Sequence, residues 1–176
     1  MELWDVYDEN RLPAGRTMVR GEPVLDGDYH LVVHVCIFNG KGEMLIQQRQ
    51  PFKKGWSNMW DITVGGSAVK GDTSRAAAER EVFEELGLKI DLNGIRPRLT
   101  VNFDGGFDDI YCIDLNVDIS KLKLQYEEVQ CVKWASEDEI KKMIDEGIFI
   151  PYHKSMIDML FWFRNNIGTY CNELRK

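Results

Sequence analysis

The chain has 176 residues, enough for one globular domain of ordinary size. Hydrophobic residues make up 44% of it and charged residues 29%, proportions that exclude wholesale disorder, a collagen-like repeat and a coiled coil. Acidic side chains outnumber basic ones by 29 to 22, which leaves a net charge of −7 and argues against binding to a nucleic-acid backbone. An acidic chain can still bind a small polyphosphate when a divalent cation lies between them.

In the first half of the chain, strand-like stretches alternate with turn residues. They predict strands over residues 4–7, 16–19, 30–38, 43–49 and 60–64. The first two would pair as an N-terminal β-hairpin within residues 1–27. Residues 30–38 are nearly continuously apolar and β-branched, which is typical of a central strand buried on both faces. The fifth stretch would end at Gly65-Gly66.

After Gly66 the periodicity becomes helical. Ala78, Val82 and Leu86 follow one another at four-residue intervals and predict a helix over residues 73–86. Either Thr73 or Asp72 could cap its first turn, and Gly87 could end it.

The rest of the chain predicts three more strands and two helices. The strands are expected over residues 99–103, 110–117 and 128–134. Ser136 and Glu139 form a capping-box pattern that begins a helix over residues 137–146. Pro151 would start the last helix, and together the C-terminal helices are expected over about residues 136–170. This order of elements predicts an α/β fold in which helices sandwich a mixed β-sheet.

The cysteines and the N-terminus indicate the compartment. Cys36, Cys112, Cys131 and Cys171 form no Cys-x-x-Cys pair and are spaced unlike zinc ligands, so we expect free thiols, mostly buried. The first residues lack the basic start and apolar stretch of a signal peptide, and no apolar run approaches the length of a membrane span. We therefore expect a cytoplasmic protein that does not associate with membranes.

An acidic cluster in the predicted helix is the strongest chemical signal. Glu81, Glu84 and Glu85 lie at positions i, i+3 and i+4, so their carboxylates would project from one helix face. Such a cluster alone is often only a solvated surface. Here Gly65 and Gly66 lie between strand and helix, where backbone can approach a ligand closely, and carboxylate oxygens are the donors that Mg²⁺ or Mn²⁺ prefers. The combination indicates metal-assisted chemistry on a phosphate.

Residues 66–88 resemble the Nudix box, G-x5-E-x7-R-E-U-x-E-E-x-G-U, in which U is aliphatic. Six letter-specific positions match, and Val82 and Leu88 match the aliphatic positions; the six are Gly66, Arg80, Glu81, Glu84, Glu85 and Gly87. At average residue usage such a match arises by chance on the order of 10⁻⁵ per chain. One position departs, because Asp72 stands where the family has glutamate. The flanking strand pattern extends the resemblance to residues 28–150.

The resemblance implies a single Nudix domain over residues 1–176, folded as an α/β/α sandwich. It also implies a metal-dependent pyrophosphohydrolase that cleaves a nucleoside diphosphate linked to another moiety, acting as a monomer or homodimer. One to three Mg²⁺ or Mn²⁺ ions would be held by Glu81, Glu84, Glu85 and the carbonyl of Gly65 or Gly66. Arg80 would orient Glu84, and the general base would be a helix glutamate (Glu84 or Glu85) or Glu128 from before the last predicted strand.

Within the family, the chain looks most like the branch related to isopentenyl diphosphate isomerase. The opening residues 4–8, the stretch from His30 to His34 and the residues 54–61 carry this softer likeness. Isomerase activity and a non-catalytic nucleotide-binding module are therefore alternatives. Isomerases of this branch carry a cysteine before the box glycine and a metal-binding histidine after it, whereas this chain has Gly65 and Ser67, so hydrolysis is favoured.

Other notable side chains have structural interpretations. We expect His34 to be a hydrogen-bonded core histidine, and Lys53 and Lys54 to be solvated. Trp56 and Trp60 are predicted to belong either to the core or to a lid over the site.

Overall fold

A computed structural model describes residues 1–168. Its first half contains β1 (Leu3–Tyr7), β2 (Pro13–Val19), β3 (His30–Phe38), β4 (Met44–Arg49), β5 (Trp60–Asp61), β6 (Val64–Ser67) and α1 (Ser74–Leu86). The second half contains β7 (Leu99–Phe103), β8 (Gly106–Asp114), a 3-10 turn (Ile119–Lys121), β9 (Val129–Ala135), α2 (Glu137–Asp145) and α3 (Lys154–Asn165).

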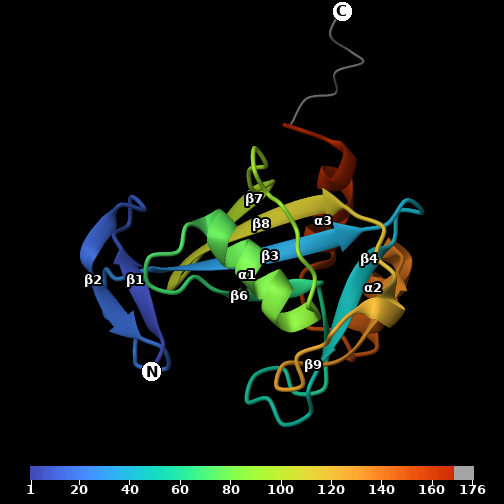
Figure 1. Cartoon of the computed structure of the whole chain (residues 1–176), viewed down its shortest axis with the longest axis horizontal. Helices are drawn as coiled ribbons and strands as arrows, with labels where there is room; N and C mark the ends of the chain where they lie inside the picture. The colour runs from blue at the N-terminus through green and yellow to red at the C-terminus, as the bar shows by residue number, and fades with distance from the viewer. Residues whose placement is uncertain (169–176) are drawn as a thin grey trace, which may run out of the picture.

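The centre of the molecule is a mixed sheet built around β3 (Figure 1). Its main order is β5-β4-β3-β8-β7, with β6 also paired to β3 and β9 to β4. The β3–β8 pair is parallel and runs from His30 opposite Gly106 to Phe38 opposite Asp114, while the other pairs are antiparallel. The central position predicted for residues 30–38 is therefore confirmed.

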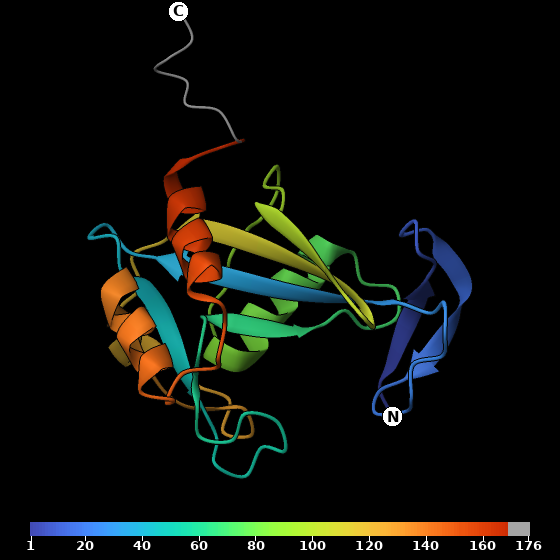
Figure 2. The ribbon, with the colours of Figure 1, turned by 180° about the vertical axis from the view of Figure 1, so that it is seen from behind.

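Helices cover both faces of this sheet, which confirms the predicted sandwich. Odd-numbered side chains of β3, from Leu31 to Ile37, pack in one core with Ala78 and Val82 of α1. The alternate side chain Phe38 packs in a second core with α2 and α3 (Figure 2). The two-residue alternation of a strand thus divides one apolar stretch between two layers.

The stretch 60–64 forms two strands instead of the single one predicted. β5 pairs with β4, whereas β6 pairs with β3, so the chain changes partner strand between them. Thr63, at the crossing, accepts a hydrogen bond from the Ile37 amide at 3.0 Å. Gly65 and Gly66 consequently lie inside β6, opposite His34 and Val33, and not after a strand. The strand β8 begins at Gly106 and not at residue 110, because its pairing with β3 continues to that point.

The N-terminal hairpin is present, with an earlier second strand than predicted. β2 begins at Pro13 because the turn is closed upstream: Asp8 Oδ1 accepts from the amides of Asn10 at 2.9 Å and Leu12 at 2.8 Å. The hairpin is docked on the rest of the fold, since Trp4 stacks on His30 with ring centroids 4.3 Å apart. The assignment of the whole chain to one domain stays a prediction.

Helix ends follow the expected capping chemistry in two of three cases. Thr73 Oγ1 accepts from the Ala76 amide at 3.2 Å, and Gly87 ends α1 with a left-handed φ of 63°. Ser136 and Glu139 form the predicted capping box of α2. The last helix begins at Lys154, three residues after the predicted start at Pro151.

The remaining structural expectations concern thiols and membranes. Cys36 and Cys112 are free and buried, and Cys131 is free and half-buried, while Cys171 and the last two residues of the predicted segment 136–170 lie outside the described residues. No helix within residues 1–168 is long and apolar enough to cross a membrane.

Candidate active site

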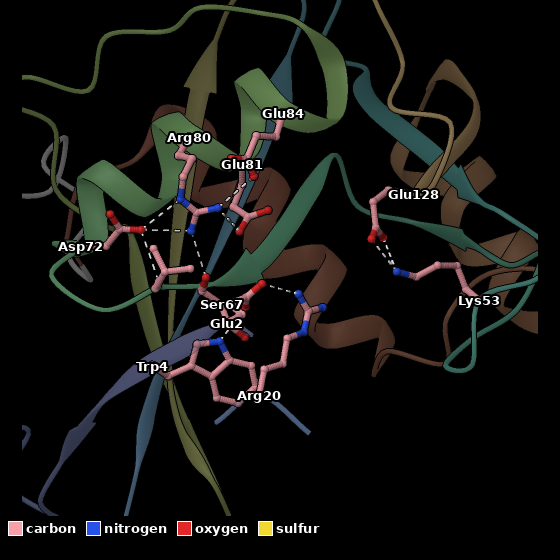
Figure 3. A network of polar contacts seen from close by, with 11 residues as sticks. Glu2, Trp4, Arg20, Lys53, Ser67, Asp72, Arg80, Glu81, Glu84 and Glu128 are labelled. Atoms are coloured by element: carbon pink, nitrogen blue, oxygen red, sulfur yellow. Dashed lines mark hydrogen bonds and ion pairs between the residues drawn. The ribbon is translucent and has the colours of Figure 1, made fainter. Parts of the chain in front are cut away.

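A cleft of about 210 Å³ lies where α1 and β6 meet the N-terminal hairpin and two loops. Its walls are charged, polar or glycine: Glu2, Arg20, Arg49, Lys53, Gly65, Gly66, Ser67, Arg80, Glu81, Glu84, Glu85, Gln125 and Glu128. Every site residue predicted from the sequence therefore lines one cleft. Figure 3 labels Arg80, Glu81, Glu84 and Glu128 among them. No sequence pattern pointed to Glu2 and Arg20, which precede the box by more than 40 residues and reach the cleft because the hairpin docks there.

Arg80 holds the acidic side chains of the box together. Its Nη1 donates to Glu81 Oε1 at 2.8 Å and to Glu84 Oε2 at 3.0 Å, so the expected pairing with Glu84 is present. Its Nη2 donates to the Ser67 carbonyl at 3.1 Å, which ties α1 to β6. Burial opposes the charged form of Arg80, but the neighbouring carboxylates raise its pKa, so the guanidinium stays a permanent cation.

Asp72, one of the two capping residues that the sequence allowed, binds Arg80 and does not cap the helix. Its Oδ2 accepts from Arg80 Nε at 3.1 Å and from Arg80 Nη2 at 3.0 Å. Thr73 supplies the cap, so the Asp72 carboxylate is free to fix the guanidinium from the side opposite Glu84. Asp72, which stands where the family has glutamate, thus anchors the arginine in this chain.

The missing side chain of Gly66 makes room for Glu81. A Cβ placed on Gly66 would lie 2.2 Å from Glu81 Cδ, inside van der Waals contact, so any other residue would displace this carboxylate. Burial raises the pKa of Glu81, and the charge of Arg80 opposes that rise. The close approach expected of the glycine pair is therefore a contact between backbone and the acidic cluster.

Glu85 is the buried member of the trio, with 5% of its surface exposed. Its Oε2 accepts from Gln47 Nε2 at 3.0 Å, and burial raises its pKa to about 8. The Gln47 Oε1 atom is itself buried without a hydrogen-bond partner. Among residues 1–168 no lysine or arginine lies within 4.0 Å of the Glu85 carboxylate, so no basic side chain offsets the cost of ionising it in this buried position.

These donors suit a hard divalent cation. Within the described part of the chain no three acidic, histidine or cysteine side chains converge as a ready-made metal centre, because Arg80 holds Glu81 and Glu84 while Glu85 turns toward Gln47. The desolvated, unpaired carboxylate of Glu85 nevertheless lacks the positive charge that a cation would provide. Carboxylate and carbonyl oxygens are the ligands of Mg²⁺ and Mn²⁺, so the residue set fits them.

Glu128 and the basic side chains form the other wall. Lys53 Nζ donates to Glu128 Oε1 at 2.6 Å, so the expectation of a solvated Lys53 was wrong, whereas Lys54 is exposed as expected. Arg20 Nη1 donates to Glu2 Oε2 at 3.0 Å, and Arg49 lies 3.6 Å from Asp61. Figure 3 shows the Lys53–Glu128 pair standing apart from the Arg80 cluster, and both groups line the cleft.

His34 is hydrogen-bonded as expected, and its ring packs against Gly65 of β6. Its Nδ1 lies 2.8 Å from Asp108. Burial alone would lower the pKa of His34, but the charge and hydrogen bond of Asp108 together raise it. A Cβ on Gly65 would lie 2.3 Å from the His34 ring, so only glycine fits at that position.

The two tryptophans separate into one core residue and one loop residue. Trp60 is partly buried in the core beneath α2 and α3, with Lys133 Nζ 4.9 Å from its ring centroid. Trp56 is 52% exposed in the loop between β4 and β5.

Comparisons with known proteins identify the family of this chain. The NUDIX domain family model matches residues 28–154. An uncharacterized Nudix hydrolase of Listeria monocytogenes is 48% identical over 94% of this chain and 96% of its own length. An isopentenyl-diphosphate Delta-isomerase of Pectobacterium atrosepticum is 32% identical, over 56% of this chain and 52% of its own.

Among solved structures, the Deinococcus radiodurans protein DR0079 superposes with a TM-score of 0.71 at 21% identity, covering 93% of this chain and 98% of its own, a likeness of fold alone. The family match spans the entire sheet from β3 to β9 together with α1 and its acidic box. The chain therefore belongs to the NUDIX domain family.

Proposed function

We propose that this protein is a metal-dependent pyrophosphohydrolase that cleaves a nucleoside diphosphate linked to another moiety. Enzymes of the family hydrolyse phosphoric anhydrides. The observation that carries the proposal is that one cleft gathers the acidic side chains of α1 together with basic side chains from the hairpin, from the end of β4 and from the loop after it. The first set suits a divalent cation and the second suits the oxygens of a diphosphate.

Glu81, Glu84 and Glu85, with the carbonyl of Gly65 or Gly66, would hold Mg²⁺ or Mn²⁺. When bound, the metal supplies positive charge that neutralises the diphosphate and makes water a better nucleophile. Arg80 keeps Glu81 and Glu84 adjacent, and Asp72 keeps Arg80 in place. The three cations Arg20, Arg49 and Lys53 line the same cleft and would bind the phosphate oxygens of the substrate.

Glu128 is the side chain we assign as general base. It lines the cleft on the wall opposite the Arg80 cluster, and its carboxylate is held by Lys53 and not by Arg80. Water would attack one phosphorus of the diphosphate and the bond from that phosphorus to the bridging oxygen would break. The proton of the water would pass to the Glu128 carboxylate, and the bridging oxygen would leave with the second phosphate.

Two features argue against isomerisation of isopentenyl diphosphate. The His34 ring fills the space where a side chain at Gly65 would stand, so the cysteine of the isomerases has no room there. The cleft walls, among residues 1–168, contain no aliphatic or aromatic side chain that could shield a hydrocarbon chain from water. The complete acidic trio argues against a non-catalytic binding module, which has no chemical need for it.

A substrate panel tests the proposal. Nucleotide-linked diphosphates and isopentenyl diphosphate are incubated with Mg²⁺ or Mn²⁺ in ¹⁸O-labelled water. We expect label in one phosphate product of a nucleotide-linked diphosphate, and no dimethylallyl diphosphate. Glu85→Gln and Glu128→Gln should each lower turnover by about 100-fold, while Glu146→Gln, at the exposed C-cap position after α2, should leave it unchanged. Isomerisation at ordinary enzymatic rates, or full activity in Glu85→Gln, would contradict the proposal.

A further inference from the structure

Two exposed aromatic side chains from different loops contact each other beside the cleft. Phe52 is 57% exposed and Tyr126 is 71% exposed, and their ring centroids lie 5.7 Å apart with the planes tilted by 42°. Single exposed apolar residues are ordinary on protein surfaces. A pair of large rings that meet while leaving most of their surface to water is a feature of binding surfaces.

Backbone contacts hold this pair at the rim of the cleft. Phe52 immediately precedes Lys53, whose ammonium group binds Glu128 inside the cleft. Tyr126 immediately follows Gln125, whose amide donates to the Glu85 carbonyl at 2.9 Å. Since neighbouring Cα atoms are about 3.8 Å apart, both rings start within one residue of cleft-lining positions. In both Figures 1 and 2 the loop after β4 lies beside the loop that precedes β9.

The composition of the cleft indicates which part of a substrate would bind to this pair of rings. The walls suit a metal and a diphosphate, but in the described residues they offer no ring or aliphatic surface to the rest of a substrate. A nucleobase has two apolar faces, and stacking a base on an aromatic side chain stabilises a complex by about 1–3 kcal/mol. The Phe52–Tyr126 pair offers such a surface beside the charged cleft, as two exposed rings that already contact each other.

We propose that Phe52 and Tyr126 form a stacking platform for the nucleobase of the substrate, while its diphosphate lies in the cleft beside Lys53. This assignment rests on the proposed function, because it takes the diphosphate end of the substrate from there. It predicts recognition through ring faces, which every nucleobase presents, so the platform should favour nucleotides over base-free diphosphates with modest discrimination among bases.

Binding measurements test the platform separately from catalysis. ADP, CDP, GDP, UDP and inorganic pyrophosphate are titrated calorimetrically into the protein with Ca²⁺ replacing Mg²⁺. The variants are Phe52→Ala, Tyr126→Ala, their double variant, and the conservative Phe52→Tyr and Tyr126→Phe. Trp162→Ala is the matched control, since Trp162 is a 43% exposed aromatic residue on α3, which packs on the sheet face opposite α1.

In the double variant we expect the Kd of the nucleoside diphosphates to rise at least about tenfold, equivalent to about 1.4 kcal/mol, and the Kd of pyrophosphate to change less than about twofold. The conservative variants and Trp162→Ala should bind like the unchanged protein. For a hydrolysed substrate, KM should rise without a matching loss of kcat. Unchanged nucleotide affinity in the double variant would overturn the proposal, as would pyrophosphate binding as tightly as every nucleotide.

The outcomes also separate this inference from the proposed function. If nucleotides bind through the two rings but no diphosphate is hydrolysed with Mg²⁺ or Mn²⁺, the platform stands and the hydrolase proposal fails. If hydrolysis proceeds and the aromatic variants retain KM and Kd, the platform is wrong and the hydrolase proposal stands.

Discussion

Replacement of Glu85 by glutamine should remove a pH dependence of stability from the metal-free protein. Burial raises the Glu85 pKa from an ordinary value of 4.5 to about 8, so the folded state binds a proton that the unfolded state releases. The stabilising effect of that proton is fully present below about pH 4.5. It falls as pH rises and is lost above about pH 8. Folding therefore becomes less favourable between these two values, and Glu85→Gln, which has no proton to lose, should escape this decline.

The size of the effect follows from the shift. Each unit of pKa difference corresponds to about 1.4 kcal/mol, so a rise from 4.5 to about 8 corresponds to up to about 5 kcal/mol over the whole interval. Between about pH 5.5 and pH 8 the unchanged protein should lose about 3 kcal/mol of unfolding free energy relative to Glu85→Gln. The amide oxygen of glutamine can still accept from Gln47, so the variant keeps the buried hydrogen bond.

Urea denaturation in EDTA at several pH values measures this difference. Glu84→Gln serves as the control, because Glu84 lies on the same helix but is 46% exposed and keeps its hydration; its pH profile should parallel that of the unchanged protein. Addition of Mg²⁺ or Mn²⁺ at about pH 8 should restore stability to the unchanged protein and much less to Glu85→Gln. If the gap between the unchanged protein and Glu85→Gln stays constant from pH 5.5 to pH 8, the reasoning about a desolvated, uncompensated Glu85 is wrong.

Three further substitutions probe the neighbourhood. Asp72→Asn weakens two hydrogen bonds to Arg80, so it should cost about 1 kcal/mol of stability, measured by urea denaturation, and lower kcat, measured from initial rates. An unaltered kcat would mean that Asp72 has only a local structural role. Arg20→Ala should raise KM about tenfold with kcat nearly unchanged, whereas Arg75→Ala, an exposed arginine outside the cleft, should leave KM as it was. Gly66→Ala would bring a Cβ to 2.2 Å from the Glu81 carboxyl carbon and should reduce the rise in Tm that Mg²⁺ causes. In the control Gly55→Ala the Cβ meets nothing within 4 Å, so this rise should stay unchanged. Equal rises in the two variants would exclude a metal site at β6.

Local interactions explain why much of the fold was predictable. The apolar stretch 30–38, the left-handed Gly87 and the capping box at Ser136 depend on residues close together in the chain, and the structure has each where the pattern predicted it. The cap of α1 is Thr73, one of the two residues that the pattern allowed. The errors at residues 60–64 and at the start of β8 occurred where a distant strand decides the bounds. Residues 60–64 divide because β5 and β6 pair with different strands, which no local pattern records.

The candidate site shows the same division. The sequence alone determined the acidic box, because the spacing of Arg80, Glu81, Glu84 and Glu85 along one helix follows from helix geometry and matches the family pattern. Only the tertiary structure decided how these carboxylates differ. Packing against Gln47 buries Glu85 and raises its pKa, while Glu84 on the same helix stays exposed.

Tertiary structure also decided what surrounds the box. Docking of the hairpin brings Glu2 and Arg20 to the cleft. The contact between two loops brings Lys53 to Glu128 and Phe52 to Tyr126, and about 70 residues separate the partners of both pairs. Burial and long-range contact depend on how the whole chain packs, so they cannot be read from the spacing of residues within one helix. The sequence therefore identified the chemistry of the box, and the fold decided the environment in which that chemistry would operate.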